Sequence, residues 1–296
     1  MQLDVLFRSC DHQGDPLTLQ STLGVDAAEV ALRCFASLLQ AISRVLPMPQ
    51  ISRCLLTVID DHSSSAYLAQ VQAMIASAGI QAQMLAMVDE GPEALTTASL
   101  NLARQHAPGL IYFADANQLH EPDALVQMIL ASQYAARLWS TDPCIIPRDE
   151  SGDYQESNGS QVILHAQRYW RTNHHHGGSM LITHAILDCY WSFFCATPPA
   201  LGANMSAAAD QLQRAIPCLS PMPALSIQVP HGLGAPLVDW SALWSEAATW
   251  VGPRLLYTAP DVDQITPEQL PAPIKPSQLL AGYKLKHFLG QPISPA

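Results

Sequence analysis

Three short polar segments, each directly after an apolar run, contain most of the residues that could do chemistry. They are residues 8–11 (RSCD), 60–63 (DDHS) and 115–117 (DAN). Asp115 and Asn117 are two positions apart, so at the end of a strand their side-chain oxygens could reach one hard cation or its waters. Asp60 and Asp61 could instead form an Asx-turn before a helix, and residues 115–117 could be an ordinary polar turn.

The elements around these segments alternate between strand and helix in the first 150 residues. Apolar runs predict strands at 3–7, 54–59, 81–88 and 110–113, and apolar periodicity predicts helices at 27–45, 65–77, 92–106 and 122–138. Short connections between them indicate βαβ units, so the predicted fold class is α/β with a mostly parallel central sheet. Ligands of such sheets bind beyond the carboxyl ends of the strands. We therefore expect the three polar segments to meet at one edge.

The second half of the sequence is less regular. Strands are predicted at 144–147 and 161–166, an apolar segment at 180–186, helices at 187–194 and 205–215, and extended chain at 217–229. From residue 258 the sequence is rich in proline, which is typical of a tail that wraps the domain or docks a partner. The predicted organisation is one domain at 1–257, divided into halves at 1–140 and 141–257, and a tail at 258–296 that could join copies into a homo-oligomer.

The composition excludes several classes of protein. Hydrophobic residues make up 49% of the 296 residues and charged residues 13%, which excludes a disordered chain. The net charge of −11 disfavours nucleic acid as a partner. The seven cysteines include no CxxC pair, so we expect free thiols in a reducing compartment. No basic leader and no apolar run of about 18 residues is present, so we predict a cytoplasmic protein without a membrane span.

Two of the three segments and two later ones resemble motifs of one enzyme superfamily, and residues 5–11 (VLFRSCD) stand where that superfamily has its first strand and donor-facing loop. Residues 111–125 (IYFADANQLHEPDAL) resemble the DxD segment of nucleotide-sugar glycosyltransferases of the GT-A fold, and residues 55–64 (LLTVIDDHSS) resemble their DDxS turn. Residues 176–187 (HGGSMLITHAIL) are similar to the acceptor-side Gly-Gly segment, and residues 209–214 (ADQLQR) to the start of an ED..L..R helix. Over residues 1–245 the sequence thus resembles the inverting family-2 group of this superfamily.

The resemblance implies a fold and a donor site. The fold would be GT-A, a Rossmann-like domain with a nucleotide-sugar half and an irregular acceptor half. Asp61, with Asp60 beside it, would bind the base of a nucleotide-diphosphate sugar, most often UDP-linked. Arg8 would lie against the base or a phosphate. Asp115 would contact the diphosphate.

The resemblance also implies a cation and a catalytic base. Asp115, Asn117 and His231 (in VPHGLG) would hold Mn²⁺ or Mg²⁺ on the diphosphate, with Asn117 standing where the family has a second acid. Asp210 would deprotonate the acceptor hydroxyl, and Asp149 and Asp153 would be the fallback bases.

The predicted function is therefore metal-dependent transfer of a hexosyl or N-acetylhexosaminyl group, with inversion, from a UDP-sugar to an unidentified glycan, lipid or protein hydroxyl. The first alternative is a non-catalytic protein of the same fold, which binds nucleotide sugar or serves as a partner subunit. Asn117 and Ala209, in place of the two acids, favour that alternative. A nucleotidyltransferase is the third reading, disfavoured because residues 8–16 contain a single glycine.

Overall fold

The structure is a computed structural model. It describes residues 1–12, 23–87, 91–106, 108–149, 161–173, 178–196, 215–229, 233 and 237–251. The predicted helix at 205–215 (apart from its last residue) and the proline-rich tail at 258–296 lie outside these ranges.

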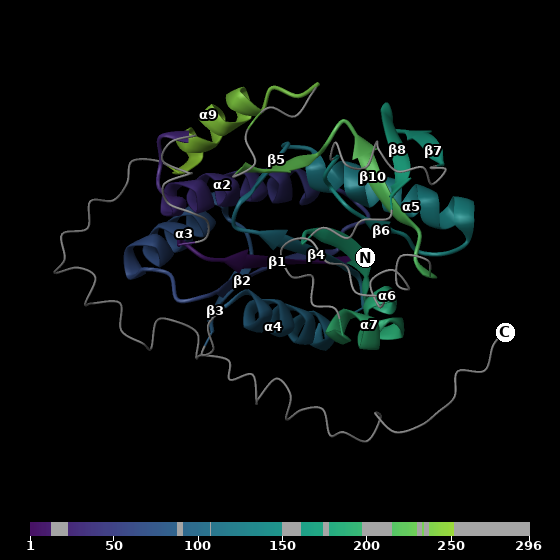
Figure 1. Cartoon of the computed structure of the whole chain (residues 1–296), viewed down its shortest axis with the longest axis horizontal. Helices are drawn as coiled ribbons and strands as arrows, with labels where there is room; N and C mark the ends of the chain where they lie inside the picture. The colour runs from purple at the N-terminus through teal and green to yellow at the C-terminus, as the bar shows by residue number, and fades with distance from the viewer. Residues whose placement is uncertain are drawn as a thin grey trace, which may run out of the picture.

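A nine-stranded sheet forms the centre of the described chain (Figure 1). In spatial order its strands are β3 (Ala82–Ala86), β2 (Arg53–Asp60), β1 (Gln2–Ser9), β4 (Leu110–Asp115), β9 (Met180–Thr183), β6 (Cys144–Ile145), β10 (Cys218–Met222), β8 (Arg168–Asn173) and β7 (Val162–His165). Strands β9 and β8 are antiparallel to their neighbours, and the others share one direction. The predicted α/β class with a mostly parallel sheet and a less regular second half is confirmed.

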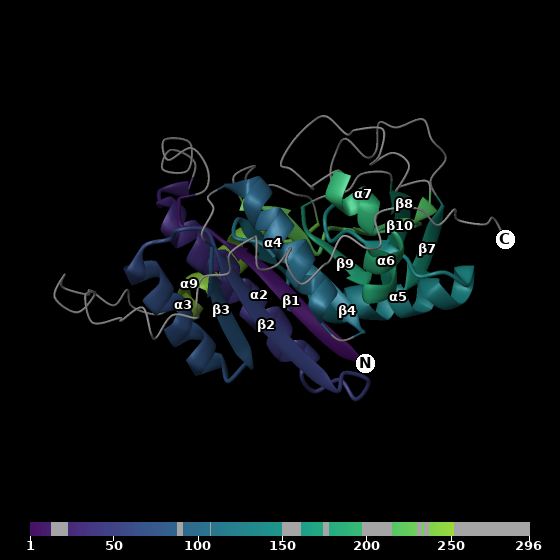
Figure 2. The ribbon, with the colours of Figure 1, turned by 90° about the horizontal axis from the view of Figure 1, so that it is seen from below.

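Helices cover both faces of this sheet. Helices α2 (Ala27–Val45), α3 (Ser65–Ala78), α5 (Ala124–Trp139) and α9 (Trp240–Val251) lie on one face in Figure 1, and α4 (Pro92–Gln105), α6 (His184–Cys189) and α7 (Trp191–Ala196) lie on the other. Figure 2 views the sheet from the side of the second group. Each face has its own apolar core, so the central strands are buried on both sides, as expected of parallel strands.

Helix α2 shows how the sequence builds one of these layers. Asp26 caps it by accepting a hydrogen bond from the Glu29 amide at 2.8 Å. Its buried face carries Phe35, whose ring lies 4.8 Å from that of Phe7 on β1. Burial of such aromatic side chains fixes the helix across the sheet, and each contributes about 2–3 kcal/mol.

The strand order reverses at β1. The chain proceeds from β1 to β2 and then β3 on one side, and it returns to place β4 on the other side of β1. The parallel register pairs Ser9 with Asp60 and Arg8 with Asp115. Neighbouring strands are about 4.8 Å apart, so the ends of β2 and β4 are separated by about 10 Å across β1. The predicted meeting of the three polar segments at one edge is confirmed.

The structure differs from the sequence-based elements mainly in the second half. Strands β8 and β5 (Gln118–His120) and helix α9 were not predicted, and β5 pairs with β11 (Ser226–Gln228) in a separate two-stranded sheet. The apolar segment at 180–186 divides at Thr183, because the Thr183 hydroxyl accepts the Ile186 amide at 3.2 Å and starts α6. None of the helices in the described ranges has the length and hydropathy needed to cross a bilayer.

Candidate functional site

A buried ion pair joins the ends of β1 and β4, where the strand order reverses. Arg8 Nη2 lies 2.7 Å from Asp115 Oδ1, and the two side chains are 5% and 11% exposed. The same nitrogen donates to the carbonyl of Gly178, two residues before the start of β9. A charge buried to this extent needs a partner, and here each residue supplies it for the other.

The segment before β9 closes over this ion pair. The Ser179 hydroxyl donates to Asp115 Oδ2 at 3.2 Å, so both carboxylate oxygens are engaged. A Cβ atom on Gly178 would lie 2.6 Å from Asp115 Oδ2 and 3.3 Å from Arg8 Nη2. The Gly-Gly segment, which the resemblance places on the acceptor side, thus brings Gly178 against the Arg8–Asp115 pair.

Replacing Gly178 with alanine is expected to lower the free energy of unfolding by about 1–3 kcal/mol, because the added methyl displaces a carboxylate that Arg8 and Ser179 hold. Urea unfolding measures this change. Ser179→Ala is the matched control. It removes one hydrogen bond without adding volume and should cost only about 1 kcal/mol. A Gly178→Ala protein as stable as the wild type would show that the carboxylate has room to move.

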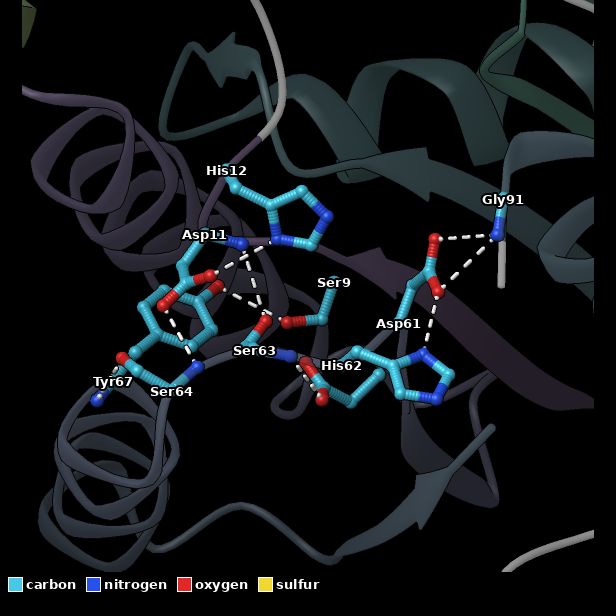
Figure 3. Close-up of polar contacts among 10 residues, drawn as sticks. Ser9, Asp11, His12, Asp61, His62, Ser63, Ser64, Tyr67 and Gly91 are labelled. Carbon is cyan, nitrogen blue, oxygen red and sulfur yellow. Dashed lines mark hydrogen bonds and ion pairs between the residues drawn. The ribbon is translucent and has the colours of Figure 1, made fainter. Parts of the chain in front are cut away.

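The end of β2 forms a second corner of the site (Figure 3). Asp60 Oδ2 accepts the Ser63 amide at 3.0 Å, and the Ser64 hydroxyl accepts the Tyr67 amide at 3.3 Å to cap α3. The alternative of an Asx-turn followed by a helix cap is therefore realised here. Burial raises the pKa of Asp60, and hydrogen bonds from Ser63 and Ser9 oppose that shift.

Asp11, after β1, ties this corner to the first strand. Its carboxylate accepts the Ser64 amide at 2.9 Å, and its own amide donates to the Ser63 hydroxyl at 3.1 Å (Figure 3). Beneath them the Ser9 hydroxyl donates to the Tyr67 hydroxyl at 3.1 Å. Burial raises the pKa of the neighbouring Cys10 thiol to about 11, so Cys10 is a neutral packing residue.

Asp61 lies between the turn and the start of α4. Its Oδ2 accepts the amide of Gly91, the N-cap of α4, at 3.1 Å, and its Oδ1 lies 3.0 Å from His62 Nδ1. The positive end of the helix dipole favours a carboxylate at this place. His62 has a φ of 58°, in the left-handed region, and thereby turns the chain away from β2 towards α3.

Asn117 is the third predicted corner. Its carbonyl accepts the Val229 amide at 2.9 Å, which ties the end of β4 to the chain after β11. Its side-chain Oδ1 is buried and has no hydrogen-bond partner among the described residues. The Arg8 Nε atom is also buried and has no hydrogen-bond partner among the described residues.

The described residues do not fit a divalent cation. Both oxygens of Asp115 are engaged, Arg8 brings a positive charge to the place a cation would take, and Asn117 offers only a neutral oxygen. Within the described ranges no group of three His, Cys, Asp or Glu side chains could hold a metal. His231 lies outside those ranges, so the expected Mn²⁺ or Mg²⁺ site stays a prediction.

The structure does not test every predicted residue. Asp210, the predicted base, and Asp153, one of the two fallback bases, lie outside the described ranges. The fallback base Asp149 pairs with Arg171 on β8, at 2.8 Å from Oδ1 to Nη2, with both side chains buried. Sequence reasoning missed Gly178 and Ser179 as neighbours of Asp115. The signal for them was the Gly-Gly segment at 176–187, which the resemblance places on the acceptor side and not beside Asp115.

Comparisons with solved structures find partial similarities, at sequence identities of 9–15% and TM-scores below 0.5. TarS of S. aureus (residues 1–349) is 13% identical, with 90% of this chain and 70% of that one covered and a TM-score of 0.47. An apo UDP-glucose pyrophosphorylase is 9% identical, with coverages of 84% and 97% and a TM-score of 0.45. The galactosyltransferase LgtC, in complex with donor and acceptor sugar analogues, is 15% identical, with coverages of 73% and 72% and a TM-score of 0.39.

No protein-family model matches the sequence, and a search of curated proteins finds no similar one. At TM-scores below 0.5 the structural similarities carry no argument about activity. The confirmed fold class rests on the order and direction of the strands, and the candidate site rests on the residues at the carboxyl ends of β1, β2 and β4.

Proposed function

We propose that this chain is a glycosyltransferase that uses a nucleotide-diphosphate sugar, with UDP as the expected nucleotide. One observation supports this most: the reversal of strand order at β1 coincides with the polar cluster of Arg8, Asp60, Asp61 and Asp115. In open α/β sheets, ligands bind at this reversal, beyond the carboxyl ends of the strands. The resemblance of the DAN and DDHS segments to donor-binding motifs supports the nature of the ligand.

The proposed reaction is a displacement at the anomeric carbon. The acceptor oxygen forms a bond to that carbon, and the bond from the carbon to the diphosphate oxygen breaks. The electron pair of the broken bond leaves with the nucleoside diphosphate, and the hydroxyl proton passes to a general base. Asp210 is our candidate for that base, and inversion follows from a single attack on the opposite face.

The nucleoside would lie over the ends of β1 and β2. Asp61 is our candidate for contact with the base, and the amide of Gly91 already orients its carboxylate (Figure 3). A carboxylate with a fixed direction can select a base with an N–H donor, which uracil offers. The diphosphate would lie towards β4, next to Arg8 and Asp115.

Release of UDP from UDP-glucose, UDP-galactose and their N-acetylated counterparts tests this proposal. The full chain should release UDP in a sugar-dependent manner, and Asp210→Asn should lower turnover at least about 100-fold with donor affinity retained. Unchanged turnover in Asp210→Asn would move the base to another acid. Failure to bind any nucleoside diphosphate would refute the donor site.

A second candidate function is non-catalytic binding of a nucleotide sugar. It is favoured by the engagement of both Asp115 oxygens and by the amide of Asn117 in place of an acid. The same assay separates the two functions: a protein that binds UDP-sugars, yet releases no UDP with any acceptor fraction, is a binding subunit.

A further inference from the structure

We propose that Arg8 takes the place of a divalent cation in this site, so that the donor diphosphate binds to a guanidinium without metal. This inference rests on the proposed function, because it concerns how the same donor is held. The group that offsets the charge of the diphosphate would then be Arg8 on β1, and not a metal ion held by residues 115–117.

The position of Arg8 is the first support. The side chain is 5% exposed, lies at the reversal of strand order, and is fixed by Asp115 Oδ1 and the Gly178 carbonyl. Its Nε–H has no acceptor among the described residues. A buried donor without an acceptor costs about 1–3 kcal/mol, and an anionic oxygen that reached it would recover that cost.

The state of Asp115 is the second support. A divalent ion bound there would have to take the carboxylate from Arg8 and then lie next to that cation. At about 4 Å the repulsion per pair of unit charges is about 4 kcal/mol near a protein surface. Since Asn117 contributes no charge, Asp115 is the one carboxylate of these two residues that could offset both the ion and Arg8 before the donor binds. The Arg8 guanidinium is already paired with Asp115, so it needs no further carboxylate before the donor binds, and its Nε–H is left to donate to a phosphate oxygen.

A second arginine lies close to the same place. Arg148 follows β6, whose carboxyl end faces the same edge as those of β1 and β4 because both β4 and β6 are antiparallel to β9. Burial raises the pKa of Tyr112 on β4, Asp115 adds to this shift, and the charges of Arg148 and Arg8 oppose it. Both guanidinium groups are therefore near enough to Tyr112 to act on it electrostatically.

Guanidinium chemistry suits a diphosphate. Its planar set of N–H donors matches two phosphate oxygens at once, and it is more weakly hydrated than an ammonium group. A guanidinium held by Asp115 and Gly178 also loses little rotational freedom when it binds. The same charge would stabilise the diphosphate as it departs.

The test is calorimetric titration of the full chain with UDP, and with GDP, CDP and ADP to cover other bases. After dialysis against EDTA, the preferred nucleotide should bind with a Kd within about twofold of that measured with excess Mn²⁺ or Mg²⁺. A Kd at least tenfold weaker in EDTA would overturn the role of Arg8 and leave the proposed function standing. Absence of binding in every buffer would overturn the proposed function itself.

Variants supply a second measurement. Arg8→Met combined with Asp115→Leu removes both charges and avoids an unpaired buried ion, and it should weaken UDP binding in EDTA at least tenfold. Arg104→Met with Asp188→Leu makes the same changes at a more exposed pair between α4 and α6, and should leave binding unchanged. Circular dichroism establishes that each protein is folded. A folded Arg8–Asp115 double variant with the wild-type Kd would overturn the proposal.

Discussion

Replacing Asp115 with alanine is expected to lower the free energy of unfolding by about 3–5 kcal/mol, as for other buried ion pairs that lose one partner. The substitution leaves the Arg8 guanidinium buried at 5% exposure, with only the Gly178 carbonyl as a described acceptor. It also removes the acceptor of the Ser179 hydroxyl. Urea or thermal unfolding of the two proteins at neutral pH measures the loss.

Two comparisons make this result specific to the buried pair. Asp188→Ala breaks the ion pair with Arg104, in which the Asp188 side chain is 47% exposed, and should cost less than about 1 kcal/mol. Arg8→Met with Asp115→Leu should recover most of the stability, since apolar replacement of both charges leaves no uncompensated ion. If Asp115→Ala costs no more than Asp188→Ala, the guanidinium reaches solvent and is not held as the structure has it.

The sequence was enough to predict the strands of the first half of the chain, because each strand is marked by a local run of apolar residues. Residues 3–7, 54–59 and 110–113 are apolar runs between helices with clear start and stop residues, such as Asp26 and Gly79. Once three strands are parallel, their carboxyl ends must share an edge. The common edge of Arg8, Asp60 and Asp115 thus followed from periodicity and chain connectivity alone.

The sequence could not predict which side chains pair with one another at that edge, because this depends on the register between neighbouring strands. Arg8 contacts Asp115 since β1 and β4 align these two positions, and a shift by one residue would place the side chains on opposite faces. Gly178 reaches the pair only because β9 packs antiparallel to β4. Contacts of this kind have no local signal in a single sequence.

The second half was harder to predict for a related reason. Strand β8 contains Arg168 and Arg171, in a segment for which the sequence analysis predicts no helix or strand. In the fold Arg171 pairs with Asp149, and Arg168 pairs with Glu121 at 2.7 Å while donating to the Ala224 carbonyl. These arginines can lie in strands because each pairs with a carboxylate that is distant in the sequence. Such distant partners cannot be identified from a local sequence pattern.

The stability of this protein is expected to fall in acid because of His120 on β5. His120 is 1% exposed and its Nε2 lies 2.7 Å from the Tyr112 hydroxyl, and burial lowers its pKa to about 3. In the unfolded chain the pKa is about 6.5, so below that pH the unfolded state binds the proton and the folded state does not. The contribution of neutral His120 is complete above pH 6.5 and is lost by about 1.4 kcal/mol for each pH unit as the pH falls towards 3.

Urea unfolding at pH 7 and pH 5 should show this loss as about 2 kcal/mol, since 1.5 units of the window are crossed. Burial raises the pKa values of Asp60 and Glu121, so their protonation stabilises the folded protein as the pH falls and opposes the effect of His120. The quantity to compare is therefore the change in unfolding free energy between pH 7 and pH 5, measured in the wild type and in His120→Gln. The glutamine variant should lack the 2 kcal/mol component whatever its absolute stability. Ser37→Ala, which removes the acceptor of the His120 amide and keeps the imidazole, should retain it. An equal change in the wild type and His120→Gln would mean that the imidazole is hydrated in the folded protein, because a solvated imidazole keeps its ordinary pKa and its protonation is not coupled to unfolding.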